Sequence, residues 1–383
     1  MTAGNLRPTW AEIDLGAVAH NLATLRGLVG PGVAIFVCLK GDAFGCGAPA
    51  VGRQAERSGA DGLAFGNVDS ALACRRAGIA LPLLVYPSVL PQAAPVLEAH
   101  DLMPTLSTLE EVAVWSGQVR RRMRVFLKVD AGGFRAGALP HHAAAVARAI
   151  ADDPRLELAG VYGHPMASYG FLDEPYTRSQ IAGFQVALSA IGEAGVRAPL
   201  RMVSSSAILL EHPEADLNAV DPGRLVVGIR FPAVAQRQRE WRPALVGLKS
   251  RLVMVKPLDA VGGVQPAPFL ALRPGMRLGL IPFGWGDGYP HQIPPKAQAL
   301  VRGRRVALLG PPHSELLRVD LTDVPDARVG DEVVLLGRSG GDAIGLSELA
   351  AQWGVEEFDV YGAIRSLPKR YGNADTNEWG DGE

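Results

Sequence analysis

The sequence predicts an α/β fold, in which a (β/α)8 TIM-type barrel is followed by a mostly antiparallel β domain. Between residues 11 and about 230, short apolar runs alternate about eight times with longer amphipathic stretches. From about residue 240, strand-like runs follow one another directly and are separated by glycine-bearing turns. We therefore expect a barrel over 11–235, a β domain over 236–372 that includes 1–10, and a disordered polar tail over 373–383.

The barrel strands are expected where apolar runs end at turn residues, and the helices where apolar residues recur at helical spacing. The expected strands are 34–40, 61–66, 82–88, 103–108, 123–130, 156–163, 200–205 and 217–223. The clearest helical segments are 48–59, 67–77, 139–152 and 174–194. In the second domain, strands are expected at 245–255, 278–282, 298–309, 316–321 and 331–336.

Composition excludes several classes of function. Lys and Arg (38) almost balance Asp and Glu (39), and no basic block suggests a nucleic-acid or membrane partner. No apolar stretch is long enough for a membrane helix, and residues 1–10 do not resemble a signal peptide. The cysteines (Cys38, Cys46 and Cys74) have neither paired number nor metal-site spacing, so we expect a cytoplasmic protein without disulfides or a metal site.

Lys40 is the first candidate for chemistry. It ends the apolar run 34–39 and precedes the turn 41–47, and functional groups of such barrels lie at the carboxyl ends of the strands. Burial there would disfavour the charged amine and leave a nucleophile able to form a Schiff base. The alternative is an ordinary solvated lysine at the end of a strand.

The other strand ends offer further polar groups, namely Lys128 with Asp130, His164, the serines 204–206, and Asp221 with Gly223. The serines precede a helix-like segment, 207–210, so hydroxyls and free N–H groups could bind an anion, although an ordinary helix cap is the alternative. Gly223 would let backbone N–H groups approach a phosphate. A lysine together with a phosphate site suggests pyridoxal 5'-phosphate as cofactor.

Several segments in order then show a resemblance that covers nearly the whole chain. They are 7–15 (RPTWAEIDL), 37–47 (VCLKGDAFGCG), 125–135 (VFLKVDAGGFR), 281–290 (IPFGWGDGYP), 319–323 (VDLTD) and 329–333 (VGDEV). This set resembles the alanine racemase family, whose lysine stands in a KADAYGHG context. The resemblance implies a pyridoxal-phosphate enzyme acting on an amino acid, and an obligate homodimer in which the β domain reaches the partner's site.

The resemblance also implies roles for single residues. Lys40 would be the Schiff-base lysine, Arg135 would bond the phenolic oxygen of the cofactor, and Lys128 would be the often carbamylated lysine that orients this arginine. His164 would lie against the cofactor ring or support the residues around it. Ser205 and the backbone of Gly223 and Arg224 would hold the phosphate.

Five positions depart from the family pattern, and four of them replace a tyrosine or a histidine. Trp285 stands where the family has its second catalytic residue, a tyrosine from the other subunit, and an indole can only donate. Phe44 and Arg365 replace two phosphate-binding tyrosines, and Cys46 replaces a histidine. An arginine at position 365 could still pair with the phosphate.

Asp221 is the departure with the largest electronic consequence, because the family has an arginine facing the pyridine nitrogen. A carboxylate there would hold a proton on that nitrogen and make the ring a better electron sink. The alternative is that Asp221 turns outward. On the side of the second subunit, His313 or Glu315 could supply the missing acid/base group, or both could be rim residues that select substrate charge.

The sequence therefore predicts a pyridoxal-phosphate-dependent amino-acid racemase or epimerase with a non-standard substrate or mechanism. The alternative is a decarboxylase or aldolase on the same fold. A non-catalytic cofactor-binding protein is a third interpretation, against which the complete β domain argues.

Overall fold

The computed structural model describes residues 6–166, 174–231, 237, 239–258, 272–294, 296–374 and 378–381. It separates into two compact units. The barrel unit comprises residues 18–43 and 48–242, and the β unit comprises 1–17, 44–47 and 243–383. The fold class predicted from the sequence is confirmed in both units.

The barrel unit is built on a nine-stranded parallel sheet with the order β5-β4-β3-β2-β10-β9-β8-β7-β6. The strands are β2 (Ala34–Cys38), β3 (Gly62–Phe65), β4 (Leu83–Val85), β5 (Leu102–Met103), β6 (Thr105–Leu106), β7 (Met123–Lys128), β8 (Leu156–Tyr162), β9 (Leu200–Ser204) and β10 (Ala219–Val220). The two ends of the sheet, β5 and β6, are separated only by Pro104, which has no N–H to continue a ladder. They are two halves of one interrupted strand, so the ring has eight positions.

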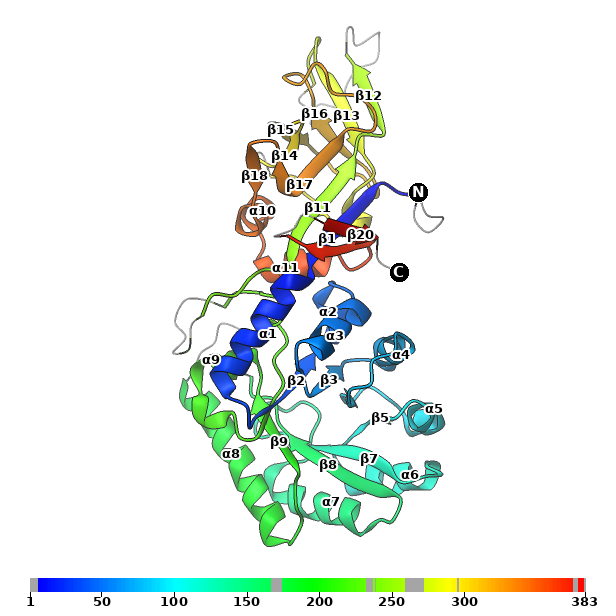
Figure 1. Ribbon diagram of the computed structural model, residues 1–383, viewed down its shortest axis with the longest axis vertical. Coiled ribbons are helices and arrows are strands. Elements are labelled where there is room, and N and C mark those ends of the chain that lie inside the picture. Colours follow the sequence, from blue (N-terminus) through cyan, green and yellow to red (C-terminus); the bar gives the residue numbers. More distant parts are fainter. Residues whose placement is uncertain are drawn as a thin grey trace. The chain divides into compact units, whose positions relative to one another are not determined.

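Helices follow the strands in alternation, and Figure 1 shows α3 to α8 outside the strands that they connect. The longer helices are α1 (Leu15–Val29), α3 (Ala48–Arg57), α4 (Val68–Arg76), α6 (Leu109–Gln118), α7 (Pro140–Asp152) and α8 (Glu174–Glu193). The short helices are α2 (Lys40–Phe44), η1 (Pro91–Ala93), α5 (Ala94–Ala99), α9 (Ser206–Glu211) and η2 (Pro213–Ala215). In α7 the buried residues recur at helical spacing (Ala143, Val146, Ala147 and Ile150), which gives that helix one apolar face.

The interior of the barrel has an apolar layer, followed by a polar layer toward the carboxyl ends of the strands. Its core cluster takes one residue from each strand position: Phe36, Ala64, Leu84, Met103, Phe126, Tyr162, Met202 and Ala219. Side chains two positions apart in a strand share a face. The residue two positions after each core residue, toward the carboxyl end of the strand, should therefore also point into the barrel. At seven of the eight positions that residue is polar, and we call these seven residues the polar layer: Cys38, Tyr86, Thr105, Lys128, His164, Ser204 and Asp221.

The β unit contains an eleven-stranded sheet with the order β12-β13-β16-β15-β14-β17-β11-β1-β19-β20, and β18 pairs with β17. Its strands are β1 (Thr9–Asp14), β11 (Leu245–Arg251), β12 (Met254–Pro257), β13 (Arg277–Ile281), β14 (Gln298–Val301), β15 (Arg304–Leu309), β16 (Leu317–Asp320), β17 (Glu332–Ser339), β18 (Asp342–Ile344), β19 (Lys369–Asn373) and β20 (Glu378–Asp381). All pairs are antiparallel except β1 with β19. The helices of this unit are η3 (Trp285–Asp287), α10 (Leu346–Trp353) and α11 (Glu357–Ala363).

Two sequence expectations differ from the structure. The tail predicted to be disordered contains β20, whose residues 378–381 pair antiparallel with β19, so that prediction is wrong for these residues. The compact units also differ from the expected domain boundaries, because residues 11–17 and 44–47 group with the β unit. Among the helices that the structure describes, none combines the length and the apolar character needed to cross a bilayer.

Candidate functional site

Lys40 lies two residues beyond Cys38, the last residue of β2, at the carboxyl end of the barrel strands as predicted. Its side chain is exposed although Ile35 to Leu39 are all buried, so the expectation that burial activates this amine is not supported in the single chain. The neighbouring strand end carries Gly66, where a Cβ would lie 3.4 Å from Cβ of Lys40. The absence of a side chain at residue 66 therefore leaves room beside the lysine.

The turn after Lys40 is left-handed. Gly41, Asp42, Ala43 and Phe44 have φ values of 63°, 60°, 53° and 59°. For residues other than glycine this conformation costs roughly 1–2 kcal/mol each, so the surrounding contacts must hold it. One such contact is the Asp42 carboxylate, whose Oδ1 accepts the N–H of Ala48 at 2.7 Å, at the start of α3.

Asp221 turns into the barrel mouth rather than outward. The hydroxyl of Tyr86 donates to its Oδ2 at 3.0 Å, and its Oδ1 is buried without a partner among the described residues. Burial raises the pKa of Asp221 to about 7, and the Tyr86 hydrogen bond and the charges of Lys40 and Lys128 oppose that rise. Near neutral pH this carboxyl is therefore poised between its two protonation states.

Lys128 and His164 share the same mouth. The ammonium of Lys128 lies 5.6 Å from the ring centroid of Tyr162, whose hydroxyl is 3.1 Å from Oγ1 of Thr105. Burial, followed by the charge of Arg135, lowers the pKa of Lys128 to about 8. Burial and the charges of Lys40, Arg135 and Lys128 lower the pKa of His164 to about 3, so its imidazole is neutral at physiological pH.

Arg135 lies in a loop that Asp130 organises. The Asp130 carboxylate accepts N–H groups of Gly132 and Phe134, both at 3.1 Å, and also that of Arg135. Gly137 is required here, because a Cβ would lie 2.6 Å from the backbone nitrogen of Asp130. The guanidinium side chain of Arg135 is exposed, which leaves it available to a ligand at the mouth.

The expected anion site is present in part. Ser205 precedes α9, makes no capping bond, and has a buried Oγ without a partner among the described residues. Gly223 differs from the expectation, because its N–H donates to Oγ of Ser206 at 3.0 Å and is not free for a phosphate. Arg224 lies with its guanidinium 5.5 Å from the ring centroid of Phe231.

The remaining predicted positions fold in the β unit. Phe44 is buried against Phe358, with ring centroids 6.2 Å apart, and Cys46 is fully buried. Arg365 is exposed just after α11. Trp285 is 42% exposed, and its indole is stacked on His291 at 5.0 Å between centroids.

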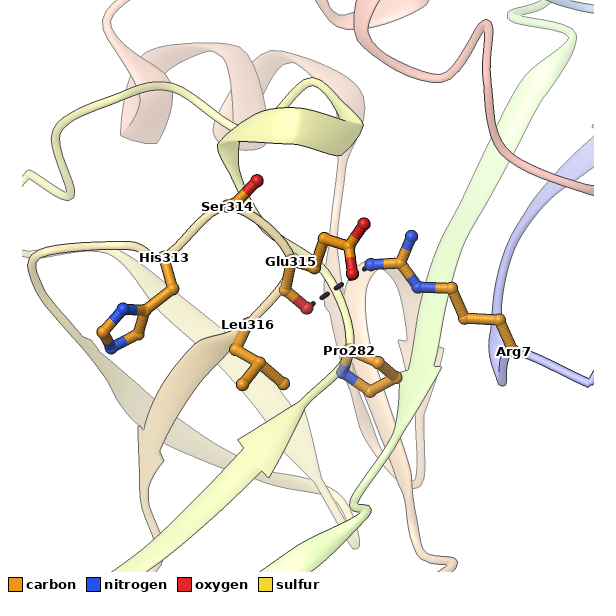
Figure 2. Close-up of a pocket in the computed structure, with 6 residues that line it drawn as sticks. All are labelled: Arg7, Pro282, His313, Ser314, Glu315 and Leu316. Atoms are coloured by element: carbon orange, nitrogen blue, oxygen red, sulfur yellow. Dashed lines mark hydrogen bonds between the residues drawn. The ribbon is translucent and has the colours of Figure 1, made fainter.

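A pocket of about 540 Å³ in the β unit is lined by Arg7, Pro282, His313, Ser314, Glu315 and Leu316 (Figure 2). Arg7 donates to the Asp287 carboxylate through its two terminal guanidinium nitrogens, at 2.5 and 2.7 Å, and to the Glu315 carbonyl at 3.3 Å. The side chain of Glu315 is exposed, and the imidazole Nε2 of His313 contacts the guanidinium of Arg318. The structure thus places the two candidate partner-side residues on one rim.

The sequence interpretation missed Tyr86, the residue that holds Asp221. A signal for it was available, because Tyr86 lies two positions beyond the core residue Leu84, just as Asp221 lies two beyond Ala219. The same rule identifies Thr105 and Cys38. Counting two residues on from the inward-facing core residue of each strand would therefore have identified the whole polar layer from the sequence.

Comparison with known proteins agrees with this architecture. Residues 13–231 match the family model "Alanine racemase, N-terminal domain", and residues 245–371 match "Alanine racemase, C-terminal domain". The chain is 34% identical over 377 residues to alanine racemase of Symbiobacterium thermophilum (97% of this chain, 99% of the relative) and 33% over 369 residues to that of Desulfovibrio desulfuricans (95% and 98%).

Among solved structures, alanine racemase from Bacillus anthracis with bound L-Ala-P aligns with a TM-score of 0.85 and 26% identity over 99% of each chain. Alanine racemase from E. faecalis aligns with a TM-score of 0.83 and 26% identity, over 97% of this chain and all of that one (100%). With both family models matched in order along nearly the whole sequence, the chain belongs to the alanine racemase family.

Proposed function

We propose that this protein is a pyridoxal-phosphate-dependent amino-acid racemase or epimerase whose substrate or mechanism differs from that of a standard alanine racemase. The observation that carries the proposal is the set of polar side chains at the barrel mouth, where the charges of Lys40, Lys128 and Arg135 all act on neutral His164. Asp221 senses two of the same charges, so these residues face one common space. Family membership supports the same reaction class.

The donor set fits pyridoxal 5'-phosphate. In the described part of the barrel unit, two buried side-chain oxygens lack partners, Oγ of Ser205 and Oδ1 of Asp221. A hydroxyl suits a phosphate oxygen, and a carboxyl suits a ring N–H. The exposed amine of Lys40, with open space at Gly66, would hold the aldehyde carbon.

Other residues would complete the binding of the cofactor. Exposed Arg135 would donate to the phenolic oxygen, with Lys128 behind it, and neutral His164 would lie near the ring. Exposed Arg365 would pair with the phosphate in place of a tyrosine. Phe44 is buried against Phe358 and would contribute only apolar contact.

When bound, the cofactor supplies an electron sink that makes the α-proton of an amino acid acidic. Lys40 would take that proton at one face of the α-carbon and return it there. Racemisation needs a second acid/base group at the opposite face, and the Trp285 indole is a hydrogen-bond donor that neither takes up nor releases a proton at neutral pH. In our proposal Glu315 or His313 of a second copy of this chain supplies that group, which makes the functional form a homodimer.

A lyase reaction is the second candidate, and Asp221 is the observation that favours it. A buried carboxyl at the ring nitrogen strengthens the electron sink, and decarboxylation or aldol cleavage then needs only Lys40. The same argument favours a substrate other than alanine, because a stronger sink tolerates less acidic substrates. We place the protein in the cytoplasm, where its three buried free cysteines would stay reduced.

The test is incubation with pyridoxal phosphate and single amino acids in D2O, with α-deuterium incorporation, D/L ratio and released CO2 all measured. We expect deuterium incorporation together with inversion. Lys40→Ala should abolish both and remove the visible absorption of bound cofactor, whereas Lys256→Ala, at an exposed lysine of β12, should change neither. CO2 or aldehyde without inversion would refute the racemase in favour of the lyase.

A further inference from the structure

Resting on the proposed function, we propose that Tyr86 is a positioning residue for Asp221. Its hydroxyl holds Oδ2, so that Oδ1 faces the ring nitrogen of the bound cofactor and Asp221 can carry a negative charge there. The family resemblance assigned no role to Tyr86, and the inference comes from the contacts of the barrel mouth.

The hydrogen bond spans the mouth of the barrel. Tyr86 follows β4, Asp221 follows β10, and β3 and β2 lie between these strands in the sheet. A phenol that donates at 3.0 Å across this distance fixes the direction of the carboxyl group, because it occupies one of the two oxygens. The other oxygen, on a residue that is 5% exposed, is the one without a partner in the described part of the chain.

Tyr86 is itself held in place. Its ring packs against that of Tyr162, with centroids 5.7 Å apart. The Tyr162 hydroxyl contacts Oγ1 of Thr105, which donates to the carbonyl of Val85 at 2.8 Å, on the residue before Tyr86. These contacts fix the position of the Tyr86 phenol beside Asp221.

The hydrogen bond also controls the charge of Asp221. The titratable groups that act on or sense this carboxyl lie on four strands: Cys38 at the end of β2 and Lys40 beyond it, Tyr86 after β4, Lys128 at the end of β7 and Tyr162 at the end of β8. Among the influences that favour the carboxylate, the Tyr86 hydrogen bond comes first, ahead of both lysines. Burial holds the pKa of Tyr86 well above 10, so its hydroxyl remains a donor at every working pH.

Loss of the Tyr86 hydroxyl should therefore leave Asp221 protonated at neutral pH. A neutral carboxylic acid cannot balance the charge of a protonated ring nitrogen. Tyr86→Phe keeps the ring and its packing and removes only the donor, so it isolates this effect. Tyr162→Phe is the matched control, because it keeps the ring that packs against Tyr86 and the bond from Thr105 to Val85, and removes only a hydroxyl that contacts Thr105 and not Asp221.

The first experiment uses the protein without cofactor. The carboxyl of Asp221 is titrated by 13C NMR of aspartate-labelled protein, and its signal is assigned by its loss in Asp221→Asn. We expect the midpoint near 7 in the wild type to rise by about one unit or more in Tyr86→Phe, roughly a tenfold change in proton affinity, and to stay in place in Tyr162→Phe. An unchanged midpoint in Tyr86→Phe would overturn the proposal, even if the variant were less stable.

The second experiment compares the affinity for pyridoxal phosphate with that for its analogue with carbon in place of the ring nitrogen. The wild type and Tyr162→Phe should prefer pyridoxal phosphate by about tenfold or more, and Tyr86→Phe should lose most of this preference. A preference that survives in Tyr86→Phe would contradict the positioning role. If neither compound bound to the wild type, the proposed function would fail, and the carboxyl titration would still decide whether Tyr86 controls Asp221.

Discussion

Asp221 is a carboxyl that the barrel buries and then surrounds with a phenol and two lysines. Burial alone would make it a neutral acid, whereas the phenol and the lysine charges move it back toward ionisation. These opposing effects leave it titrating near neutral pH, where it can hold a proton or give one up. Such a group suits a ring nitrogen whose protonation changes during a reaction.

The shifted pKa predicts how stability depends on pH. Between 3.8 and about 7 the folded protein keeps the Asp221 proton while the unfolded chain loses it, so this group makes the fold less stable as pH rises through that window. Asp221→Asn mimics the neutral acid and removes the effect. We expect the unfolding free energy of the variant, relative to wild type, to increase from pH 4 to pH 8 by about 2–4 kcal/mol.

Urea unfolding of the cofactor-free proteins at the two pH values measures this difference. The comparison within each pH value cancels the titration of all other groups. A difference between variant and wild type that is the same at pH 4 and pH 8 would mean that Asp221 ionises normally in the fold.

Single residues were predictable where their chain neighbours marked them. Lys40 stands between an apolar run and a glycine-bearing turn, and Ser205 stands in a serine run, so both positions were visible in the sequence. Tyr86 was not, because its meaning depends on Asp221, a residue 135 positions away that only the closed barrel brings within reach. The exposure of Lys40 was also unpredictable, since the five residues before it, 35–39, are all buried.

At the level of elements, the left-handed turn after β2 is the least expected feature. The sequence showed a glycine-bearing turn, but not that Ala43 and Phe44 would also take positive φ. Local propensity disfavours this conformation, so tertiary contacts must impose it. The strands themselves were predictable because each apolar run ends at turn residues, whereas β20 was missed because its polar sequence pairs only at an edge, with β19.

Asp42 should be the residue that holds this turn to α3. Asp42→Ala loses the acceptor for the N–H of Ala48 and places a less suitable residue in left-handed backbone, at a cost of about 1–2 kcal/mol in unfolding free energy. Asp42→Asn keeps both an acceptor oxygen and tolerance of this conformation, so it should cost much less.

Urea unfolding of the two variants tests this, with cofactor affinity as a second measurement. We expect weaker affinity in Asp42→Ala, because the turn fixes the direction of Lys40. Equal losses in Asp42→Ala and Asp42→Asn would show that the carboxylate charge matters rather than the hydrogen bond.

At the scale of the whole molecule, the proposed chemistry is divided between two kinds of unit. The barrel unit supplies the mouth with Lys40 and Asp221, and the β unit supplies the rim with Glu315 and His313. The sequence predicted both sets from the family resemblance, but it could not reveal which rim group exchanges protons. The structure adds His291, which is stacked on Trp285, as an imidazole that the sequence interpretation overlooked.

A site shared between two copies predicts complementation. Lys40→Ala should be inactive, and a Glu315→Gln/His313→Gln double variant should be inactive if the rim supplies the second acid/base group. Random mixing after dissociation makes half of the dimers hybrid, each with one intact site, so activity should recover to roughly a quarter of the wild-type value.

Racemisation of the mixture, compared with each variant alone, measures this recovery. No recovery despite hybrid dimers detected by native mass spectrometry would place both groups in one chain. Full activity of the double variant would exclude Glu315 and His313 as the second acid/base group. His291 would then be the next candidate, and His291→Gln the variant that tests it.

Residues 44–47, which begin within the turn that follows Lys40, affect how far the barrel can be separated from the rest of the chain. They belong to the β unit, where a Cβ on Gly45 would lie 2.3 Å from the Tyr361 carbonyl oxygen and one on Gly47 would lie 1.9 Å from the Tyr371 hydroxyl. The chain that carries Lys40 is thus threaded through both folding units within eight residues. We therefore expect a barrel cut out at the apparent boundary to lose the contacts that hold residues 44–47, and with them the fixed position of the lysine beside them.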